Sequence, residues 1–182
     1  KESYAEVRAV FEAITAQTEA GACVTHVGAD GAGHFVKMVH NGIEYADMQM
    51  LAEVYDLMRR GLRLSEPEMA EIFTQWNQGP LESFLVELTA QVLAKTDPET
   101  GRPLVSLIMD RAGQKGTGRW TVQAALEQGV AVPGIAAAVD ARVLSAAKQE
   151  REAAELSLQG PVIDKVEDAQ SMLADLHGAL YA

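Results

Sequence analysis

The chain has 182 residues, of which 48% are hydrophobic but only 5% aromatic, and its formal net charge is -11. This length allows one domain with a sizeable core, and the aliphatic composition favours a helix-rich interior. Because phosphates repel an acidic chain that has no Lys/Arg cluster, we expect no nucleic-acid partner. A single cysteine, Cys23, excludes an intramolecular disulfide and a cysteine-based metal site. No apolar run approaches the roughly 18 residues of a membrane span, and no signal pattern is present, so we expect a cytoplasmic protein without a membrane partner.

The N-terminal residues 1–28 predict one helix followed by one strand. Residues 23–27 form a short, alternating, β-branched run that is typical of a strand. A single strand cannot form a sheet, so we expect residues 1–28 to complete a sheet whose other strands lie upstream of Lys1. The chain also lacks an initial Met and stops within a helical pattern, which we interpret as part of a longer protein. The helix is predicted by apolar residues at helical spacing: Tyr4, Val7, Phe11 and Ile14.

Residues 29–182 predict an all-helical domain, so the fold class is mainly α. A loop leads into a long helix from about Gly33 to Arg60, which would be about 40 Å long and would form the central post of the fold. Gly61 is a candidate C-cap of this helix, and residues 65–68 (Ser-Glu-Pro-Glu) form a capping box for the next one. Residues 104–110 are ambiguous between strand and helix. Further helices are predicted over residues 81–93, 120–128, 133–158 and 164–182.

The long helix carries a narrow polar strip within an otherwise apolar run. Its members lie at i, i+3, i+4 and i+7 and therefore share one helix face. This pattern indicates a buried helix whose strip faces a functional site. A structural seam is equally compatible with the spacing, with the Lys and Glu paired and the other two side chains satisfying backbone groups. The strip consists of Lys37, His40, Asn41 and Glu44.

A second segment, residues 113–118, places three glycines around Lys115 and Thr117. Backbone amides can approach an anion closely in such a segment. It is not a Walker P-loop, because the leading glycine is absent and the Gly-Thr order differs. Composition alone favours a flexible surface loop here, and Arg142, on a later helix, is by itself typical of a solvated helix charge.

Three segments in the same order resemble 6-phosphogluconate dehydrogenases. Residues 31–49 are similar to the substrate-binding helix of that family, and residues 112–121 resemble its segment whose Lys and Thr bind the substrate phosphate. Residues 138–148 look like the helix that presents a phosphate-binding Arg. The resemblance covers nearly all of the chain, with two departures: Ala46 replaces an expected Gly, and Asp140 an expected apolar or aromatic residue.

The resemblance implies NADP-dependent oxidation of 6-phosphogluconate, loss of carbon dioxide and formation of ribulose 5-phosphate. Lys37 would act as the general base, which requires a pKa lowered by desolvation, and would later stabilise the developing oxyanion. Glu44 would protonate C1 of the enediol, which requires a raised pKa. His40 and Asn41 would orient the substrate hydroxyls and carboxylate. The phosphate would be held by Tyr45, Lys115, Thr117 and Arg142.

The same resemblance sets limits on what this chain does alone. Its residues contain no G-x-G-x-x-G turn after a strand, so NADP would be bound mainly by an upstream coenzyme domain, of which residues 1–28 are the end. Family enzymes complete the phosphate pocket with a tail from a partner subunit, which implies a homodimer. We therefore expect the isolated chain to be inactive. Two alternatives remain: a related β-hydroxyacid dehydrogenase, against which the phosphate residues argue, and a non-catalytic helical scaffold.

Overall fold

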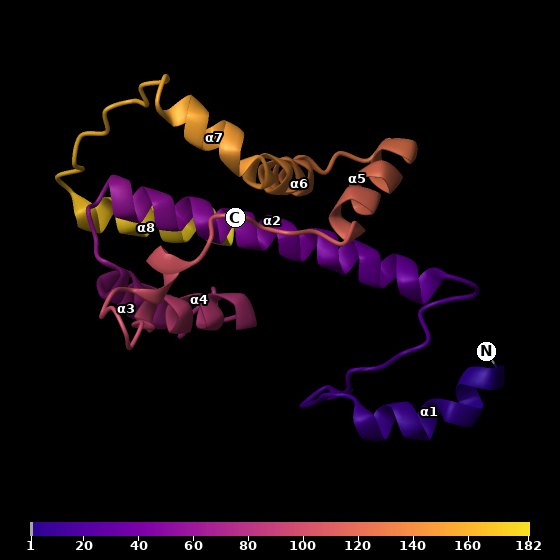
Figure 1. The fold of residues 1–182 in the computed structure, drawn as a ribbon. Coiled ribbons are helices and arrows are strands. Elements are labelled where there is room, and N and C mark those ends of the chain that lie inside the picture. The colour runs from indigo at the N-terminus through magenta and orange to yellow at the C-terminus, as the bar shows by residue number, and fades with distance from the viewer. Residues whose placement is uncertain (1) are drawn as a thin grey trace.

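The computed structural model describes residues 2–182 and confirms the mainly α fold (Figure 1). Within that range no helix is both long and apolar enough to cross a membrane. The strands are β1 (Gln17–Thr18) and β2 (Gly21–Ala22), and a 3-10 helix, η1, spans Leu104–Leu107. The α-helices are α1 (Glu2–Ile14), α2 (Ala32–Arg60), α3 (Glu66–Trp76), α4 (Phe84–Ala94), α5 (Thr117–Glu127), α6 (Pro133–Ala146), α7 (Lys148–Glu155) and α8 (Ala169–Tyr181).

Helix α1 and the β1–β2 hairpin lie apart from the other helices (Figure 1). Helix α1 has no buried residue, and three members of its predicted apolar face, Val7, Phe11 and Ile14, are exposed. The strand predicted over residues 23–27 is wrong, because the structure places β1 and β2 earlier, paired antiparallel, and leaves residues 23–27 irregular. An extended segment becomes a strand only when a neighbouring strand pairs with its N–H and C=O groups, and the described residues supply no such neighbour to this run.

Helix α2 is the central post that the sequence predicts. Its 29 residues end at Arg60, and the C-cap is Gly61, whose N–H donates to the Leu57 carbonyl at 2.8 Å. Gly61 has the right-handed φ of -80°, so its small size rather than a left-handed turn explains the residue: a Cβ there would lie 2.8 Å from the Leu57 oxygen. The predicted C-cap is confirmed, with steric crowding as its cause.

Helices α3 and α4 pack against each other and, with the C-terminal half of α2, enclose one hydrophobic cluster. The predicted capping box is present, since the Glu68 carboxylate accepts hydrogen bonds from Ser65 N at 2.8 Å and from Ser65 Oγ at 2.6 Å. These two bonds lower the pKa of Glu68. Ser83 caps α4 by accepting from Val86 N–H at 3.3 Å. Both helices are therefore started by local sequence, independently of packing.

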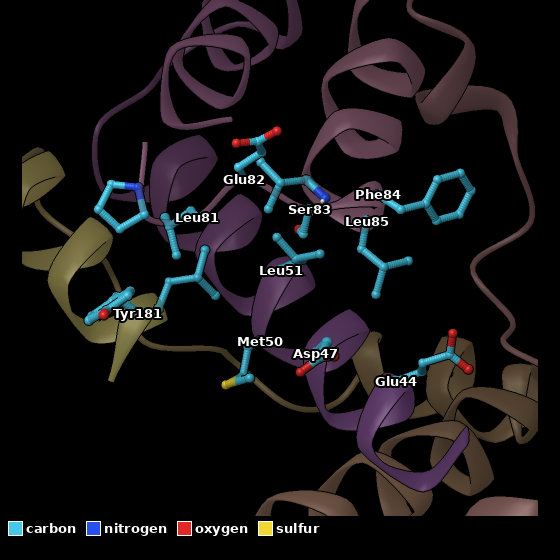
Figure 2. Close-up of a pocket in the computed structure, with 13 residues that line it drawn as sticks. Glu44, Asp47, Met50, Leu51, Leu81, Glu82, Ser83, Phe84, Leu85 and Tyr181 are labelled. Carbon is cyan, nitrogen blue, oxygen red and sulfur yellow. Dashed lines mark hydrogen bonds between the residues drawn. The ribbon is translucent and has the colours of Figure 1, made fainter. Parts of the chain in front are cut away.

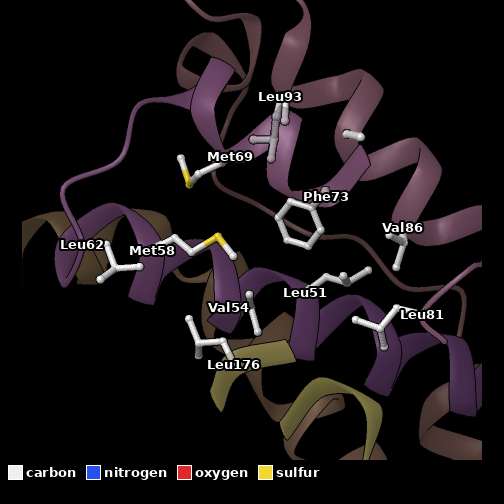
Figure 3. Packing of buried hydrophobic residues seen from close by; sticks show 12 residues of the cluster. Leu51, Val54, Met58, Leu62, Met69, Phe73, Leu81, Val86, Leu93 and Leu176 are labelled. Atoms are coloured by element: carbon white, nitrogen blue, oxygen red, sulfur yellow. The ribbon is translucent and has the colours of Figure 1, made fainter. Parts of the chain in front are cut away.

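The hydrophobic core lies where α2, α3, α4 and α8 meet (Figure 3). Phe73, Met58 and Met69 are its largest fully buried side chains. Helix α8 returns to α2 through an extended segment, in which Val166 N–H donates to the Gly61 carbonyl at 2.9 Å. Segments more than a hundred residues apart in sequence thus close one core at the C-terminal end of α2.

Helices α5 and α6 pack on the N-terminal half of α2 and leave its other faces open. The prediction that α2 is buried is therefore wrong for this half, in which Phe35, Val36 and Ile43 are 46%, 51% and 51% exposed. Several predicted helix bounds also change: the helices expected from residues 81 and 164 begin at Phe84 and Ala169. The helix expected over residues 120–128 begins three residues earlier, and the one expected over 133–158 breaks at Ala147, whose ψ of 48° is not helical.

We predict that Phe73→Ala lowers the free energy of unfolding by about 3–5 kcal/mol, since it empties a fully buried site that neighbouring side chains cannot refill. Urea denaturation of the 182-residue chain measures this. Phe84→Ala is the matched control, because Phe84 is 73% exposed, and we expect a change below about 0.5 kcal/mol. Equal losses from the two variants would contradict this description of the core.

Candidate functional site

In the polar strip of α2, His40 lies between Lys37 and Glu44 and contacts both. Lys37 Nζ lies 3.3 Å from His40 Nδ1, and Glu44 Oε2 lies 3.4 Å from the same nitrogen. No direct Lys37–Glu44 salt bridge occurs among residues 2–182, so the seam in which those two side chains pair with each other is not formed. One imidazole nitrogen can either donate or accept, so Nδ1 of His40 can accept from Lys37 or donate to Glu44, but it cannot do both at once.

The strip is open to solvent rather than dry. The His40 and Glu44 side chains are 58% and 41% exposed, Lys37 is exposed, and Asn41 is half-buried. A lysine that acts as a base at neutral pH needs burial in an apolar or cationic environment. Residues 2–182 do not bury Lys37, so any such environment has to come from groups outside them.

Arg142 links three segments that are distant in sequence. From α6, its guanidinium carbon lies 3.7 Å from the centroid of the Tyr45 ring on α2, a cation–π distance. Its Nη1 donates to the Gly113 carbonyl, in the glycine-rich segment, at 2.6 Å. Thus Tyr45, Arg142 and the loop before Lys115, all predicted to serve the phosphate end, meet in the fold.

Only part of the glycine-rich segment is a loop. Gly116, with a left-handed φ of 113°, is the N-cap of α5, and Thr117 is the first residue of that helix. The positive end of the helix dipole and its free N–H groups lie there, which favours an anion. Lys115 precedes this N-terminus and is exposed. The sequence prediction of amides near an anion is compatible with this geometry, whereas the flexible-loop interpretation fails at Thr117.

Sequence reasoning missed the contact that fixes α5 against α2. Thr121 is 4% exposed, and its Oγ1 lies 3.0 Å from the Met38 carbonyl and 2.8 Å from the Thr117 carbonyl. A Cβ on Gly42 would lie 2.8 Å from that hydroxyl, and one on Gly118 would lie 2.6 Å from the Tyr45 ring. A glycine in the middle of a long helix was the available signal, because it costs helix stability and usually has a packing reason.

Glu44 also lines a groove of about 470 Å³ on another side of α2 (Figure 2). Glu44, Asp47 and Met50 form the wall of the groove that belongs to α2. The segment before α4 and the end of α8, with Tyr181, form its other walls. Partial burial is the main cause that raises the pKa of Asp47; the charge of Glu44 adds to it and His40 opposes it. The groove contains none of the other predicted site residues.

Residues 33–182 match the family model of the 6-phosphogluconate dehydrogenase C-terminal domain. The chain belongs to the 6-phosphogluconate dehydrogenase family. A decarboxylating 6-phosphogluconate dehydrogenase of Synechococcus elongatus is 51% identical over 98% of this chain. One of Bacillus subtilis, named NADP(+)-dependent and decarboxylating, is 48% identical over all of it. The chain spans about 39% of the length of each.

The fold agrees with a solved structure of the same family. The Plasmodium falciparum 6-phosphogluconate dehydrogenase, described in its apo form and in complexes with NADP+ and with 6-phosphogluconate, superposes with a TM-score of 0.92 at 43% identity. The match covers all of this chain and 39% of that protein. The resemblance deduced from three sequence segments is therefore confirmed, together with the helical fold that it implied.

We predict that Gly118→Ala destabilises the chain by about 1–3 kcal/mol, because the new Cβ overlaps the Tyr45 ring and lies 3.1 Å from Val139 Cγ2. Gly178→Ala is the control: it lies in helix α8 with nothing within 4 Å of the new Cβ, so better helix propensity should stabilise by up to about 1 kcal/mol. Thermal unfolding distinguishes the two. Equal effects of the two substitutions would mean that α5 does not pack closely on α2.

Because the pKa of Asp47 is raised, we predict that Asp47→Asn increases the free energy of unfolding in a pH-dependent way. A carboxyl whose pKa is higher in the folded than in the unfolded chain binds its proton more tightly when folded, so stability falls as the pH rises through that range. The variant should thus be more stable than the parent chain at pH 7 and equal to it below the ordinary aspartate pKa of about 3.8. Urea unfolding at several pH values tests this, with Asp56→Asn as the control, for which we expect no gain at pH 7.

Proposed function

We propose that this chain supplies the substrate-binding helical part of an enzyme that oxidises and decarboxylates 6-phosphogluconate to ribulose 5-phosphate and carbon dioxide. The observation that carries the proposal is the meeting of two predicted groups in one fold. The Lys37–His40–Glu44 strip runs along α2, and Tyr45, directly after it, stacks on Arg142 beside the glycine-rich loop. A sugar acid with a phosphate at its far end matches a strip of hydroxyl-binding groups that leads into a cationic end.

At the reacting end, Lys37 takes the proton of the C3 hydroxyl as the hydride leaves C3. The resulting ammonium then stabilises the charge that develops on the C3 oxygen when the carboxylate leaves as carbon dioxide. Glu44 gives its proton to C1 of the enediol, and tautomerisation yields the ketone. His40 and Asn41, between and beside them on α2, hydrogen-bond the substrate hydroxyls and carboxylate and hold C3 near Lys37.

At the phosphate end, cationic and hydrogen-bonding groups come from three elements. Arg142 offers a planar guanidinium, of which Nη1 is engaged by Gly113, and Lys115 offers a mobile ammonium. Thr117 contributes a hydroxyl at the N-terminus of α5, and Tyr45 supports the Arg142 plane. These groups give local positive charge to a chain whose net charge is -11.

The hydride acceptor proposed is NADP, as in the name of the Bacillus subtilis relative. The residues present do not fit this cofactor, because the strands described in residues 2–182 form only a hairpin of two two-residue strands, and the loop from β2 to α2 has no G-x-G-x-x-G pattern. No step is therefore assigned to this chain beyond proton transfer, orientation and phosphate binding. We expect the 182-residue chain alone to form no NADPH.

The organisation of the whole enzyme is part of the same proposal. Residues 1–28 would be the end of a coenzyme domain, which is supported by their separation from the helical body and by the start of the family match at residue 33, and residues 29–182 the substrate and dimerisation domain. A homodimer in the cytoplasm is proposed as well. The homodimer is supported by exposed apolar side chains on α4, such as Phe84 and Leu88. The cytoplasmic location is supported by the single, free Cys23. A rice relative is by name chloroplastic.

The proposal predicts turnover in a chimera in which this chain replaces the matching segment of the Bacillus subtilis relative. We expect NADPH formation from 6-phosphogluconate, and a loss of about 10²–10⁴-fold in kcat for Lys37→Met, since that variant lacks the general base. Lys95→Met, an exposed lysine that follows α4, is the matched control and should keep the activity. A folded chimera with normal turnover after Lys37→Met would exclude Lys37 as the base.

Calorimetry on the chain itself separates binding from chemistry. We expect 6-phosphogluconate to bind more tightly than gluconate at low ionic strength, and the difference to shrink as salt screens the phosphate. Arg142→Ala should remove the difference. Equal binding of both sugars would contradict the assignment of the phosphate end.

A further inference from the structure

The loop that presents Lys115 has few backbone hydrogen bonds of its own. Residues 108–116 belong to no helix or strand, and within them only Arg111 N–H donates to another member, the Met109 carbonyl, at 2.8 Å. Such a segment would sample many conformations and would hold a ligand poorly, because ordering it on binding costs conformational entropy. Its order in this fold has to come from side chains of other elements.

Those side chains come from one edge of α6 and α7 and recur every three residues. Arg142 binds the Gly113 carbonyl at 2.6 Å, and Ser145 Oγ accepts from Ala112 N–H at 2.9 Å. The edge runs antiparallel to the loop, so later residues of the helices meet earlier residues of the loop. The four members of this edge are Arg142, Ser145, Lys148 and Arg151.

Asp110 is the most heavily held position of the loop. Its two carboxylate oxygens accept from Lys148 Nζ at 2.6 Å and from Arg151 Nη1 at 2.8 Å, and its backbone carbonyl accepts from Arg151 Nη2 at 2.9 Å. These bonds, that of Lys148 first, lower the pKa of Asp110 well below its ordinary value. We call Asp110, Ser145, Lys148 and Arg151 the loop clasp.

The helix break makes this geometry possible. Helix α6 ends at Ala146, and Arg151 Nη2 also donates to the Ser145 carbonyl at 3.1 Å, one of the last carbonyls of α6 that no helical N–H can reach. Arg151 therefore joins the two helices and the loop at one point. Asp110 is 55% exposed, and exposed ion pairs contribute little to the free energy of unfolding, so the effect of the clasp is on position more than on stability.

We propose that the loop clasp is a set of positioning residues for phosphate binding. Gly113, held by Arg142, and Gly116, fixed as the N-cap of α5, leave only two residues between them, Gln114 and Lys115. With the clasp in place, side chains of α6 and α7 hold the loop at Asp110 and Ala112 as well as at Gly113. Without the clasp, Arg142 is the one side chain of these helices that still holds residues 108–115, so the segment that presents Lys115 is less well fixed. The inference rests on the proposed function, because it assigns these residues to the recognition of the phosphate on the sugar acid.

Kinetics of the Bacillus subtilis chimera test the positioning role. We expect Asp110→Asn to raise KM for 6-phosphogluconate about tenfold and to leave kcat within about twofold, because only the distant phosphate contact is loosened. Lys148→Arg by itself keeps a cation beside Asp110 and should leave KM within about threefold of the parent chimera. Asp56→Asn breaks an exposed pair with Arg60, of 2.9 Å, far from the loop and should change neither constant. An Asp110→Asn chimera with unchanged KM would overturn the proposal.

Amide hydrogen exchange of the 182-residue chain tests, independently of activity, whether the clasp orders the loop. We expect Ser145→Ala and Asp110→Asn to speed exchange of the Ala112 amide at least about threefold, whereas Asp56→Asn leaves it unchanged. Unchanged exchange in both clasp variants would also overturn the proposal. If the parent chimera shows no turnover of 6-phosphogluconate, the proposed function fails, while the exchange rates still show whether the clasp orders the loop.

Discussion

The close approach of α5 to α2 is the contact on which the rest of the site depends. Gly42 and Gly118 lie where a side chain would overlap Thr121 or Tyr45, and Thr121 fills the remaining space and reaches the Met38 carbonyl at 3.0 Å. Because α5 starts at Thr117, this contact also sets the position of Gly116 and of the loop before it. Two missing side chains on helix surfaces thus place the residues proposed to bind the phosphate beside the polar strip of α2.

Positive charge at the site is created locally, against the charge of the whole chain. With a net charge of -11, the chain as a whole would repel a phosphorylated sugar acid at long range, but screening limits that repulsion to about 10 Å at ordinary ionic strength. Within that distance, the fold gathers Arg142, the N-terminus of α5 and the loop that carries Lys115. Asp110, the acidic residue of this loop, is paired with Lys148 and Arg151.

The two ends of α2 differ in what covers them. At the C-terminal end, α3, α4 and α8 enclose Met58 and Phe73 completely, whereas at the other end Phe35, Val36 and Ile43 remain exposed beside Lys37. A proton-transferring lysine needs the dry environment that is present at the first end and absent at the second. Since the chain spans about 39% of the length of its relatives, the family enzymes have ample further residues with which to supply it.

The sequence by itself determined the local features of this protein. Helical spacing placed the members of the polar strip on one face, Ser65 and Glu68 started α3, and Gly61 ended α2, because each depends on residues within one or two turns. Three matching segments were enough to predict the family. The order of these segments along the chain was enough to recognise the family, but it did not predict which segments would lie together in the fold.

Only the tertiary structure decided which distant groups meet. The contact of Arg142 with Gly113 and Tyr45, the break at Ala147 and the hold of Lys148 and Arg151 on Asp110 follow from how α6 lies across α2 and α5. Likewise, residues 23–27 have the composition of a strand but no neighbour to pair with. Burial and strand pairing depend on the surroundings of a residue, and hydrophobic periodicity records which face of an element is apolar without recording what covers it.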